Sequence, residues 1–275
     1  MMDRYAVFGC PIEHSKSPLI HRLFAEQTGE QLVYEKELVA EGEFNTAADS
    51  FFDAGGRGLN ITAPHKIAAL KYAARLTERA RVAGAVNTLA LDHGGVLGDN
   101  TDGVGLVTDI INIQGWDIRA QRLLILGAGG AVRGVLQPLL AQAPAQLVIA
   151  NRTPAKALQL AREFRLSGEA QACGFEDLQG QQFDLVINAT AASLAGELPR
   201  LPDNLLAADA ACYDMTYAAE PTVFLQWAAD HGASHCADGL GMLVGQAAES
   251  FYLWRGKRPR VEPVLEVLRQ ALSAN

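Results

Sequence analysis

Short apolar runs alternate with amphipathic segments along most of the chain. In the N-terminal part, the predicted strands are residues 5–9, 32–38 and 58–61, and the predicted helices are residues 18–29, 44–54 and 66–82. Two further runs, 86–91 and 96–98, are separated by Asp92-His93-Gly94-Gly95, which predicts an antiparallel hairpin. Strands that alternate with helices predict an α/β fold with a mostly parallel sheet.

A second series of strands begins at Arg122 and has the spacing of a Rossmann-type sheet. Its predicted strands are residues 123–126, 147–150, 185–188 and 211–214, and the predicted helices of this half and the C-terminus are residues 103–114, 240–252 and 263–272. We therefore predict two domains. One comprises residues 1–102 with 239–275, and the other comprises residues 103–238.

The glycine-rich turn after strand 123–126 is the most informative local pattern. Gly127, Gly129 and Gly130 let the backbone approach a pyrophosphate, and the helix from Ala131 points its N-terminal amides at that anion. The third glycine of the dinucleotide motif would fall at Val132, so an ordinary strand-turn-helix is the alternative.

The next predicted strand ends in Asn151-Arg152-Thr153, and Lys156 follows closely. An NAD site usually has an acidic residue here to bind the ribose 2′-hydroxyl. A neutral and basic strand end instead favours the 2′-phosphate of NADP. Thr153-Pro154 also suits the start of a helix, and the two interpretations are compatible.

Composition narrows the class of protein. The 275 residues are 49% hydrophobic and 20% charged, as expected for a packed globular chain, and the formal charge of −8 argues against a general nucleic-acid binder. We see no signal segment or membrane span and expect a cytoplasmic protein. We interpret Cys10, Cys173, Cys212 and Cys236 as reduced thiols. We expect His231 and His235 to lie in a loop rather than bind metal, and we predict no metal site.

Four polar clusters lie in the predicted first domain. Ser15 and Ser17 follow the first strand, although Ser17 before a proline also suits a helix N-cap. Asn60 and Thr62 share one face of a strand. Lys66 stands at the start of a helix, where the helix dipole makes a positive charge unfavourable. A solvated surface lysine is the alternative.

The other two clusters surround Asn87 and Asp102. Asn87 begins an apolar strand and needs hydrogen-bond partners, which nearby backbone could supply. Asp102 ends the polar turn 98–103, which could simply cap the next helix through Asx turns.

Taken together, these motifs resemble the shikimate dehydrogenase family nearly end to end. The resemblance is carried by Gly9-x-Pro11-Ile12-x-His14-Ser15-x-Ser17-Pro18, Asn60-Ile61-Thr62-x-Pro64-x-Lys66, Gly84-Ala85-Val86-Asn87-Thr88, Gly98-Asp99-Asn100-Thr101-Asp102-Gly103, Gly127-Ala128-Gly129-Gly130-Ala131-x-Arg133, Asn151-Arg152-Thr153, Ile187-Asn188-Ala189-Thr190, Tyr213-Asp214-Met215-x-Tyr217 and Gly239-Leu240-Gly241-Met242-Leu243-x-x-Gln246.

The resemblance implies reversible, NADPH-dependent reduction of 3-dehydroshikimate to shikimate in aromatic amino-acid biosynthesis. Residues 1–102 with 239–275 would form the substrate domain, and 103–238 the NADP domain. The implied catalytic pair is Lys66 and Asp102. The implied substrate contacts are Ser15, Ser17, Asn60, Thr62, Asn87, Tyr217 and Gln246, and the implied cofactor contacts are Gly127, Ala128, Gly129, Gly130, Ala131, Asn151, Arg152, Thr153, Lys156, Met215 and Gly239.

Several alternatives stay open at this point. They are an NAD-dependent quinate/shikimate dehydrogenase, a non-catalytic metabolite-binding regulator of the same fold, and a different α/β reductase. The sequence does not separate a proton-donating from an electrostatic role for Lys66, or a monomer from a homodimer. Ala191-Ala192-Ser193 departs from the family pattern, which commonly has Ser and a nearby Gly after Asn-Ala-Thr, in a loop that lies near the cofactor in the family.

Overall fold

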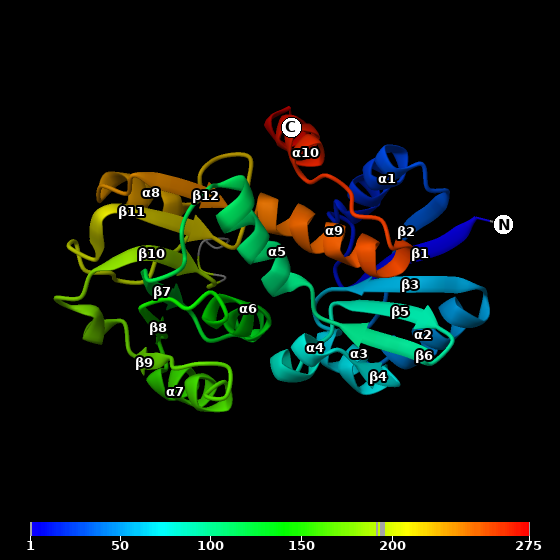
Figure 1. Cartoon of the computed structure of the whole chain (residues 1–275), viewed down its shortest axis with the longest axis horizontal. Helices are drawn as coiled ribbons and strands as arrows, with labels where there is room; N and C mark the ends of the chain where they lie inside the picture. The colour runs from blue at the N-terminus through cyan, green and yellow to red at the C-terminus, as the bar shows by residue number, and fades with distance from the viewer. Residues whose placement is uncertain (1, 191, 193–195, 275) are drawn as a thin grey trace. The chain divides into compact units, whose positions relative to one another are not determined.

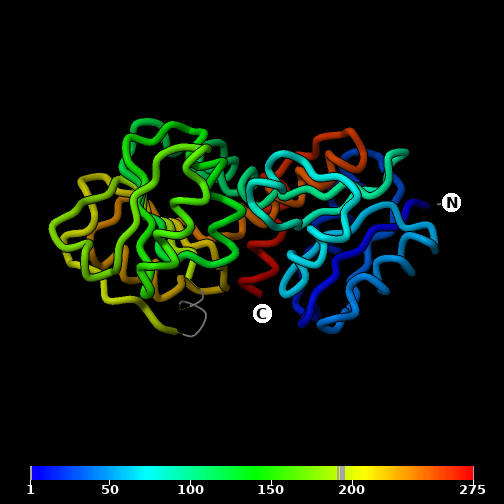
Figure 2. Tube along the Cα trace, turned by 90° about the horizontal axis from the view of Figure 1, so that it is seen from below, coloured from blue at the N-terminus to red at the C-terminus, as the bar shows by residue number. Residues whose placement is uncertain are grey.

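The computed structural model describes residues 2–190, 192 and 196–274, so Ala191 and Ser193 of the unusual loop lie outside the described residues. The chain divides into two compact units, Met1–Gly105 with Val244–Val264 and Leu106–Leu243 with Leu265–Asn275. It passes between them inside α5 (Asp102–Thr108), α9 (Leu240–Arg255) and α10 (Glu262–Ser273), as the colours of Figure 2 allow the reader to follow. Within the described residues, no helix is long and apolar enough to cross a membrane.

The first unit is built on a mixed sheet with the order β2-β1-β3-β5-β6-β4 (Figure 1). Of its described strands only β5 is antiparallel to its neighbours, because the predicted hairpin joins it to β6. The strands are β1 (Asp3–Gly9), β2 (Leu32–Leu38), β3 (Gly56–Ile61), β4 (Arg75–Leu76), β5 (Thr88–Asp92) and β6 (Gly95–Asp99), and the helices are α1 (Ser17–Thr28), α2 (Phe44–Asp53), α3 (Lys66–Tyr72) and α4 (Glu78–Ala83).

Alternate residues of β1 serve opposite faces of this sheet, as strand geometry requires. Phe8 makes edge-to-face contacts with Phe44 and Phe51 of α2, with ring centroids 6.3 and 5.8 Å apart. Tyr5 stacks on Trp254 of α9 at 4.6 Å. Both faces of β1 are therefore buried against helices from distant parts of the chain.

The second unit contains a parallel sheet with the order β12-β11-β10-β7-β8-β9. Numbered within this unit, the order is the Rossmann order 3-2-1-4-5-6, read from the opposite edge. The strands are β7 (Arg122–Leu126), β8 (Gln146–Ala150), β9 (Gln171–Cys173), β10 (Phe183–Asn188), β11 (Leu206–Asp214) and β12 (His235–Asp238), and the helices are α6 (Gly130–Leu140), α7 (Pro154–Glu163), α8 (Val223–Asp230), a π-helix (Asp109–Ile113) and a 3-10 helix (Glu176–Leu178). The predicted α/β class and Rossmann-type sheet are confirmed.

Several local predictions differ from the structure. The helix predicted over 66–82 is split, because β4 pairs with β6 and Thr77 then starts a new helix as its N-cap. The helix predicted over 103–114 ends in the π-helix. Ser17 does not cap α1, which starts at Ser17 itself with Lys16 in the cap position. Strands β9 and β12 were not predicted, and His235 begins β12 rather than lying in a loop.

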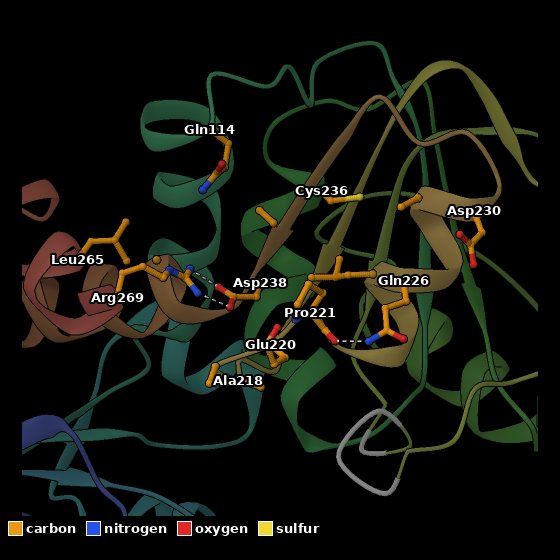
Figure 3. A pocket seen from close by; sticks show the side chains of 15 residues that line it. Gln114, Ala218, Glu220, Pro221, Gln226, Asp230, Cys236, Asp238, Leu265 and Arg269 are labelled. Atoms are coloured by element: carbon orange, nitrogen blue, oxygen red, sulfur yellow. Dashed lines mark hydrogen bonds and ion pairs between the residues drawn. The ribbon is translucent and has the colours of Figure 1, made fainter. Parts of the chain in front are cut away.

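The C-terminal boundary also differs from the predicted range 239–275. Residues 240–243 and 265–274 pack within the second unit, since Arg269 of α10 forms a two-point ion pair with Asp238, both N–O distances being 2.7 Å. Leu265 and Arg269 also line a cavity of about 670 Å³ together with residues of α8 and β12 (Figure 3). The end of the last helix thus closes over the edge of the Rossmann-type sheet.

We predict that Thr77→Ala lowers the free energy of unfolding by about 1 kcal/mol. The Thr77 hydroxyl accepts a hydrogen bond from Ala80 N (3.3 Å) and donates one to Asp99 Oδ1 (2.6 Å). Urea denaturation measures the change. Thr28→Ala is the matched control, because among the described residues that hydroxyl bonds only carbonyls of its own helix, and its cost should stay below about 0.5 kcal/mol. Equal losses in the two variants would contradict the capping role.

Candidate active site

Lys66 and Asp102 form an ion pair in the first unit, with Nζ and Oδ2 2.5 Å apart. Lys66 is the first residue of α3 and Asp102 the first of α5. The lysine side chain keeps 32% of its surface exposed, whereas the carboxylate keeps 12%. An ammonium group held on one side by a carboxylate can direct its remaining N–H bonds at a ligand oxygen. The predicted catalytic pair is thus brought together by the fold.

Asn87 fixes the carboxylate of this pair. Its Nδ2 donates to Asp102 Oδ1 at 2.7 Å and to Thr101 Oγ1 at 2.9 Å. Its Oδ1 accepts from the Thr101 backbone N–H at 2.9 Å, which confirms that nearby backbone supplies a partner for this amide. Gln246 of α9 lies beside this amide, with Oε1 3.4 Å from Asn87 Nδ2. Two predicted substrate residues therefore lie next to the predicted catalytic pair.

The turn before α5 contains two side-chain-to-backbone bonds, and the one from Asp102 N to Asn100 is an Asx-turn bond, as one interpretation of residues 98–103 predicts. Asp99 Oδ1 accepts from Asn100 N at 2.7 Å, and Asn100 Oδ1 accepts from Asp102 N at 3.2 Å. Burial alone would raise the pKa of Asp99, but hydrogen bonds and the charge of Arg79 outweigh it and lower that pKa. The anchored Asp99 holds the turn that presents Asp102.

The remaining predicted substrate residues of this unit lie at the ends of β1 and β3. Ser15 Oγ accepts from the Ser17 backbone N–H at 3.3 Å, in the turn that leads into α1. Thr62 follows β3 and donates its backbone N–H to Phe8 O at 3.0 Å. Asn60 is only 6% exposed. These positions lie at the carboxyl ends of parallel strands, where α/β proteins bind ligands.

Tyr217, the last predicted substrate residue, belongs to the second unit. Its pKa is raised, first by burial and then by the negative charge of Asp238. The phenol therefore stays protonated at neutral pH and can donate a hydrogen bond.

The glycine-rich turn of the second unit lies at the point where the strand order reverses, between β7 and β10. Gly127 has φ +109°, and a Cβ there would lie 3.3 Å from the backbone of Ala189. Gly129 and Gly130 are exposed, and a Cβ on either would meet no described atom within 4 Å. Helix α6 starts at Gly130 without a side-chain cap, and Ala131 is exposed in its first turn. Its amides are thus available to an anion.

The loop after β8 lies next to this turn, because Leu126 and Ala150 are neighbours in the sheet. Asn151 braces the loop through a 2.9 Å hydrogen bond from Nδ2 to Thr153 O. Thr153 occupies the cap position of α7 without a side-chain cap bond. Arg152 and Lys156 are exposed, and their side chains form no ion pair or hydrogen bond within the described part of the chain. Two unpaired cations at a helix start suit a phosphate.

Met215 and Gly239 complete the predicted cofactor set at the ends of β11 and β12. A Cβ on Gly239 would lie 2.3 Å from Met215 O, so only glycine permits this approach. The loop of Met215 depends on Asp214, which is fully buried. Asp214 Oδ1 accepts from Asn188 Nδ2 at 3.2 Å and from Thr216 N at 3.0 Å.

Sequence reasoning missed several side chains that hold the site. They are Thr88, Thr101 and Ser250 around Asn87, and Asn188 and Asp214 in the second unit. Polar residues at the ends of apolar strands were a usable signal for Thr88, Asn188 and Asp214. No local signal marked Ser250, because it lies in α9, far along the chain from the strands that it contacts.

Comparison with known protein families covers most of the chain. Residues 7–89 match the model of the shikimate dehydrogenase substrate binding domain, residues 109–195 that of shikimate / quinate 5-dehydrogenase, and residues 239–269 that of the shikimate 5′-dehydrogenase C-terminal domain.

Individual proteins are similar over nearly the full length. Shikimate dehydrogenase (NADP(+)) of Cellvibrio japonicus is 63% identical over 273 residues, which is 99% of each chain. The crystal structure of an Ael1 enzyme from Pseudomonas putida has a TM-score of 0.92 at 46% identity, over 97% of this chain and 98% of that one. Shikimate 5-dehydrogenase from Thermus thermophilus, in complex with NADP(H) and shikimate, has a TM-score of 0.86 at 33% identity, over 98% and 100%.

We predict that Asn87→Ala lowers the free energy of unfolding by about 1–3 kcal/mol, because Asp102 and the Thr101 N–H lose a buried partner. Urea denaturation measures the loss. Asn45→Ala, at an exposed position of α2, is the matched control and should change stability by less than about 0.5 kcal/mol. A cost for Asn87→Ala as small as that of the control would show that the amide does not hold this turn.

Proposed function

This chain belongs to the shikimate dehydrogenase family, and on that premise we propose that it catalyses the reversible, NADPH-dependent reduction of 3-dehydroshikimate to shikimate. The observation that carries the assignment of residues is the Lys66–Asp102 pair, with its partly exposed ammonium group. Related proteins named shikimate dehydrogenase (NADP(+)) are similar over 97–99% of the chain. The reaction belongs to the shikimate pathway of aromatic amino-acid biosynthesis.

Lys66 and Asp102 act on the substrate oxygen. As the ketone is reduced, negative charge develops on its oxygen, and the Lys66 ammonium stabilises that charge and can donate the proton. Asp102 holds the ammonium and accepts a hydrogen bond from a substrate hydroxyl. Ser15, Ser17, Asn60, Thr62, Asn87, Tyr217 and Gln246 supply hydroxyl and amide groups for the rest of the substrate. Such groups favour a polyhydroxylated acid, because an analogue without the hydroxyls leaves them unpaired.

The residues at the strand ends of the second unit suit the binding of NADP. NADPH, when bound, supplies the hydride. The amides at the start of α6 would bind the pyrophosphate, and the space above Gly129 and Gly130 leaves room for it. Arg152 and Lys156, with Asn151 and Thr153, would hold the 2′-phosphate.

The alternatives have less support. The curated relatives named above carry NADP(+) in their names, so the NAD-dependent quinate/shikimate enzyme finds no support among them. A non-catalytic regulator has no need of the paired Lys66 and Asp102. Steady-state rates with shikimate and quinate, each with NADP and NAD, separate these functions. Activity with shikimate and NADP should exceed every other combination.

We also propose a cytoplasmic enzyme that works as a monomer or a homodimer. The four cysteines are free thiols, which is typical of proteins from reducing compartments. The formal charge of −8 gives no support to a nucleic-acid partner. Light scattering after size-exclusion chromatography measures the mass directly.

We predict that Lys66→Ala lowers kcat roughly 10²–10³-fold, because one group that stabilises the developing oxyanion is lost. Shikimate binding should change little. Lys71→Ala is the matched control, since Lys71 is exposed in the same helix. Asp102→Asn should also be severely impaired. A loss in Lys66→Ala below about fivefold would remove this lysine from the mechanism.

We predict that Arg152→Ala raises the KM for NADP roughly 10–150-fold and affects the KM for NAD much less. The arginine can meet the 2′-phosphate with paired donors. Arg165→Ala, at another exposed position of the second unit, should leave both values unchanged. Equal rises for the two cofactors would assign Arg152 a structural role at the start of α7 instead.

A further inference from the structure

Tyr34 connects two of the residues proposed to bind substrate. It lies on the edge strand β2, and its phenol O–H donates to Asn60 Oδ1 at 2.7 Å. The Ser17 side chain lies near the same phenol, and it lowers the pKa of Tyr34 against the larger, opposite effect of burial. Ser17 starts α1 and Asn60 lies in β3, so this phenol stands beside polar groups of two elements that are distant in the chain.

The amide of Asn60 is held from both ends. Oδ1 also faces His21 Nε2 at 3.2 Å, and Nδ2 donates to Ser250 Oγ at 3.0 Å and to Thr88 Oγ1 at 3.2 Å. A carbonyl oxygen has two lone pairs, and here each has a donor. Nδ2 also faces the backbone carbonyl oxygen of Asn87 at 3.4 Å, and because a carbonyl can only accept, this end of the amide is the nitrogen.

His21 supports this arrangement as a neutral ring. It is fully buried, and burial lowers its pKa to about 3 in spite of the hydrogen bond with Asn60. Because Nε2 faces an oxygen acceptor, the single proton of the neutral ring is on Nε2. The ring stacks on Tyr34 with centroids 4.2 Å apart and an interplanar angle of 7°. The phenol is thus fixed in position before any ligand arrives.

We propose that Tyr34 is a positioning residue of the substrate site, which orients the Ser17 hydroxyl and the Asn60 amide for the hydroxylated acid. The proposal rests on the proposed function of this unit. Tyr34 acts through these two residues and does not itself need to touch the substrate. Preorganisation of this kind contributes affinity, because the polar groups are already ordered when the ligand binds.

Loss of the Tyr34 hydroxyl should change the position of the proposed catalytic pair very little. Asn60 reaches Asp102 through Thr88, whose Oγ1 donates to Asn87 Oδ1 at 2.9 Å. The backbone N–H of Thr101 anchors Asn87 independently of Asn60. Loss of the Tyr34 hydroxyl should therefore alter substrate binding far more than turnover.

The experiment compares Tyr34→Phe with the wild type in steady-state kinetics. This variant removes the hydroxyl and keeps the stacked ring. We expect the KM for shikimate to rise about five- to tenfold, while kcat and the KM for NADP change less than about twofold. Tyr72→Phe is the matched control, because its hydroxyl donates to the exposed Asp49 at 2.8 Å, and it should leave all three values unchanged.

A double-mutant cycle tests the route of the effect. In a Ser17→Ala background, Tyr34→Phe should raise the KM for shikimate by a clearly smaller factor than in the wild type, because one of the two polar groups that Tyr34 is proposed to orient is already lost. If Tyr34→Phe does not fold, Ser250→Ala removes the opposite anchor of the same amide. It should then raise the KM for shikimate and leave the KM for NADP unchanged.

Three results would overturn the proposal: an unchanged KM for shikimate in Tyr34→Phe, equal changes for both substrates, or full additivity with Ser17→Ala. Failure of the proposed function looks different, since the wild-type protein would then not oxidise shikimate with NADP at all.

Discussion

The requirement that buried amides keep hydrogen-bond partners organises the first unit. Asn60 and Asn87 lie at the ends of neighbouring strands, with 6% and 3% of their surface exposed. Neither can lose its contacts without leaving polar atoms unpaired inside the protein. Their bonds therefore tie the hairpin, the turn before α5 and α9 into one rigid group. Lys66 and Asp102 stand on that group, so the geometry of the proposed catalytic pair depends on residues outside the pair.

The second unit obeys a different constraint, which is the geometry of parallel strands. Their carboxyl ends meet at one edge, and the strand order reverses between β7 and β10. The turn of Gly127 follows β7, and the loop of Asn151 follows the neighbouring strand β8. Asp214 then acts as the buried acceptor that holds the ends of β10 and β11 together. Backbone geometry thus provides the proposed anion site, and side chains refine it.

Charge is used differently in the two units. The chain is acidic overall, so each basic group that faces a ligand must act locally. Lys66 is paired with a carboxylate, which fixes its position and leaves part of it exposed. Arg152 and Lys156 have no such partner within the described residues, and a phosphate would supply one. A fixed ammonium suits proton chemistry at a defined atom, whereas unpaired cations on a loop suit recognition of a charged group.

Local patterns in the sequence were enough to predict most strands and helices, the Rossmann-type series and the glycine turn. They also marked Lys66, Asn87 and Asp102 as polar positions, but only the family resemblance implied site roles for these three residues. These features depend on neighbouring residues, so period, glycine and capping signals reveal them. The split of the segment 66–82, the short strands β9 and β12, and the end of α10 depended on pairing across the chain. The contacts of Tyr34 and Ser250 also depended on tertiary structure, because both residues bond Asn60 from elements that are distant in sequence. Only tertiary structure decides such contacts, since a hydrogen bond between distant segments leaves no local periodicity in the chain.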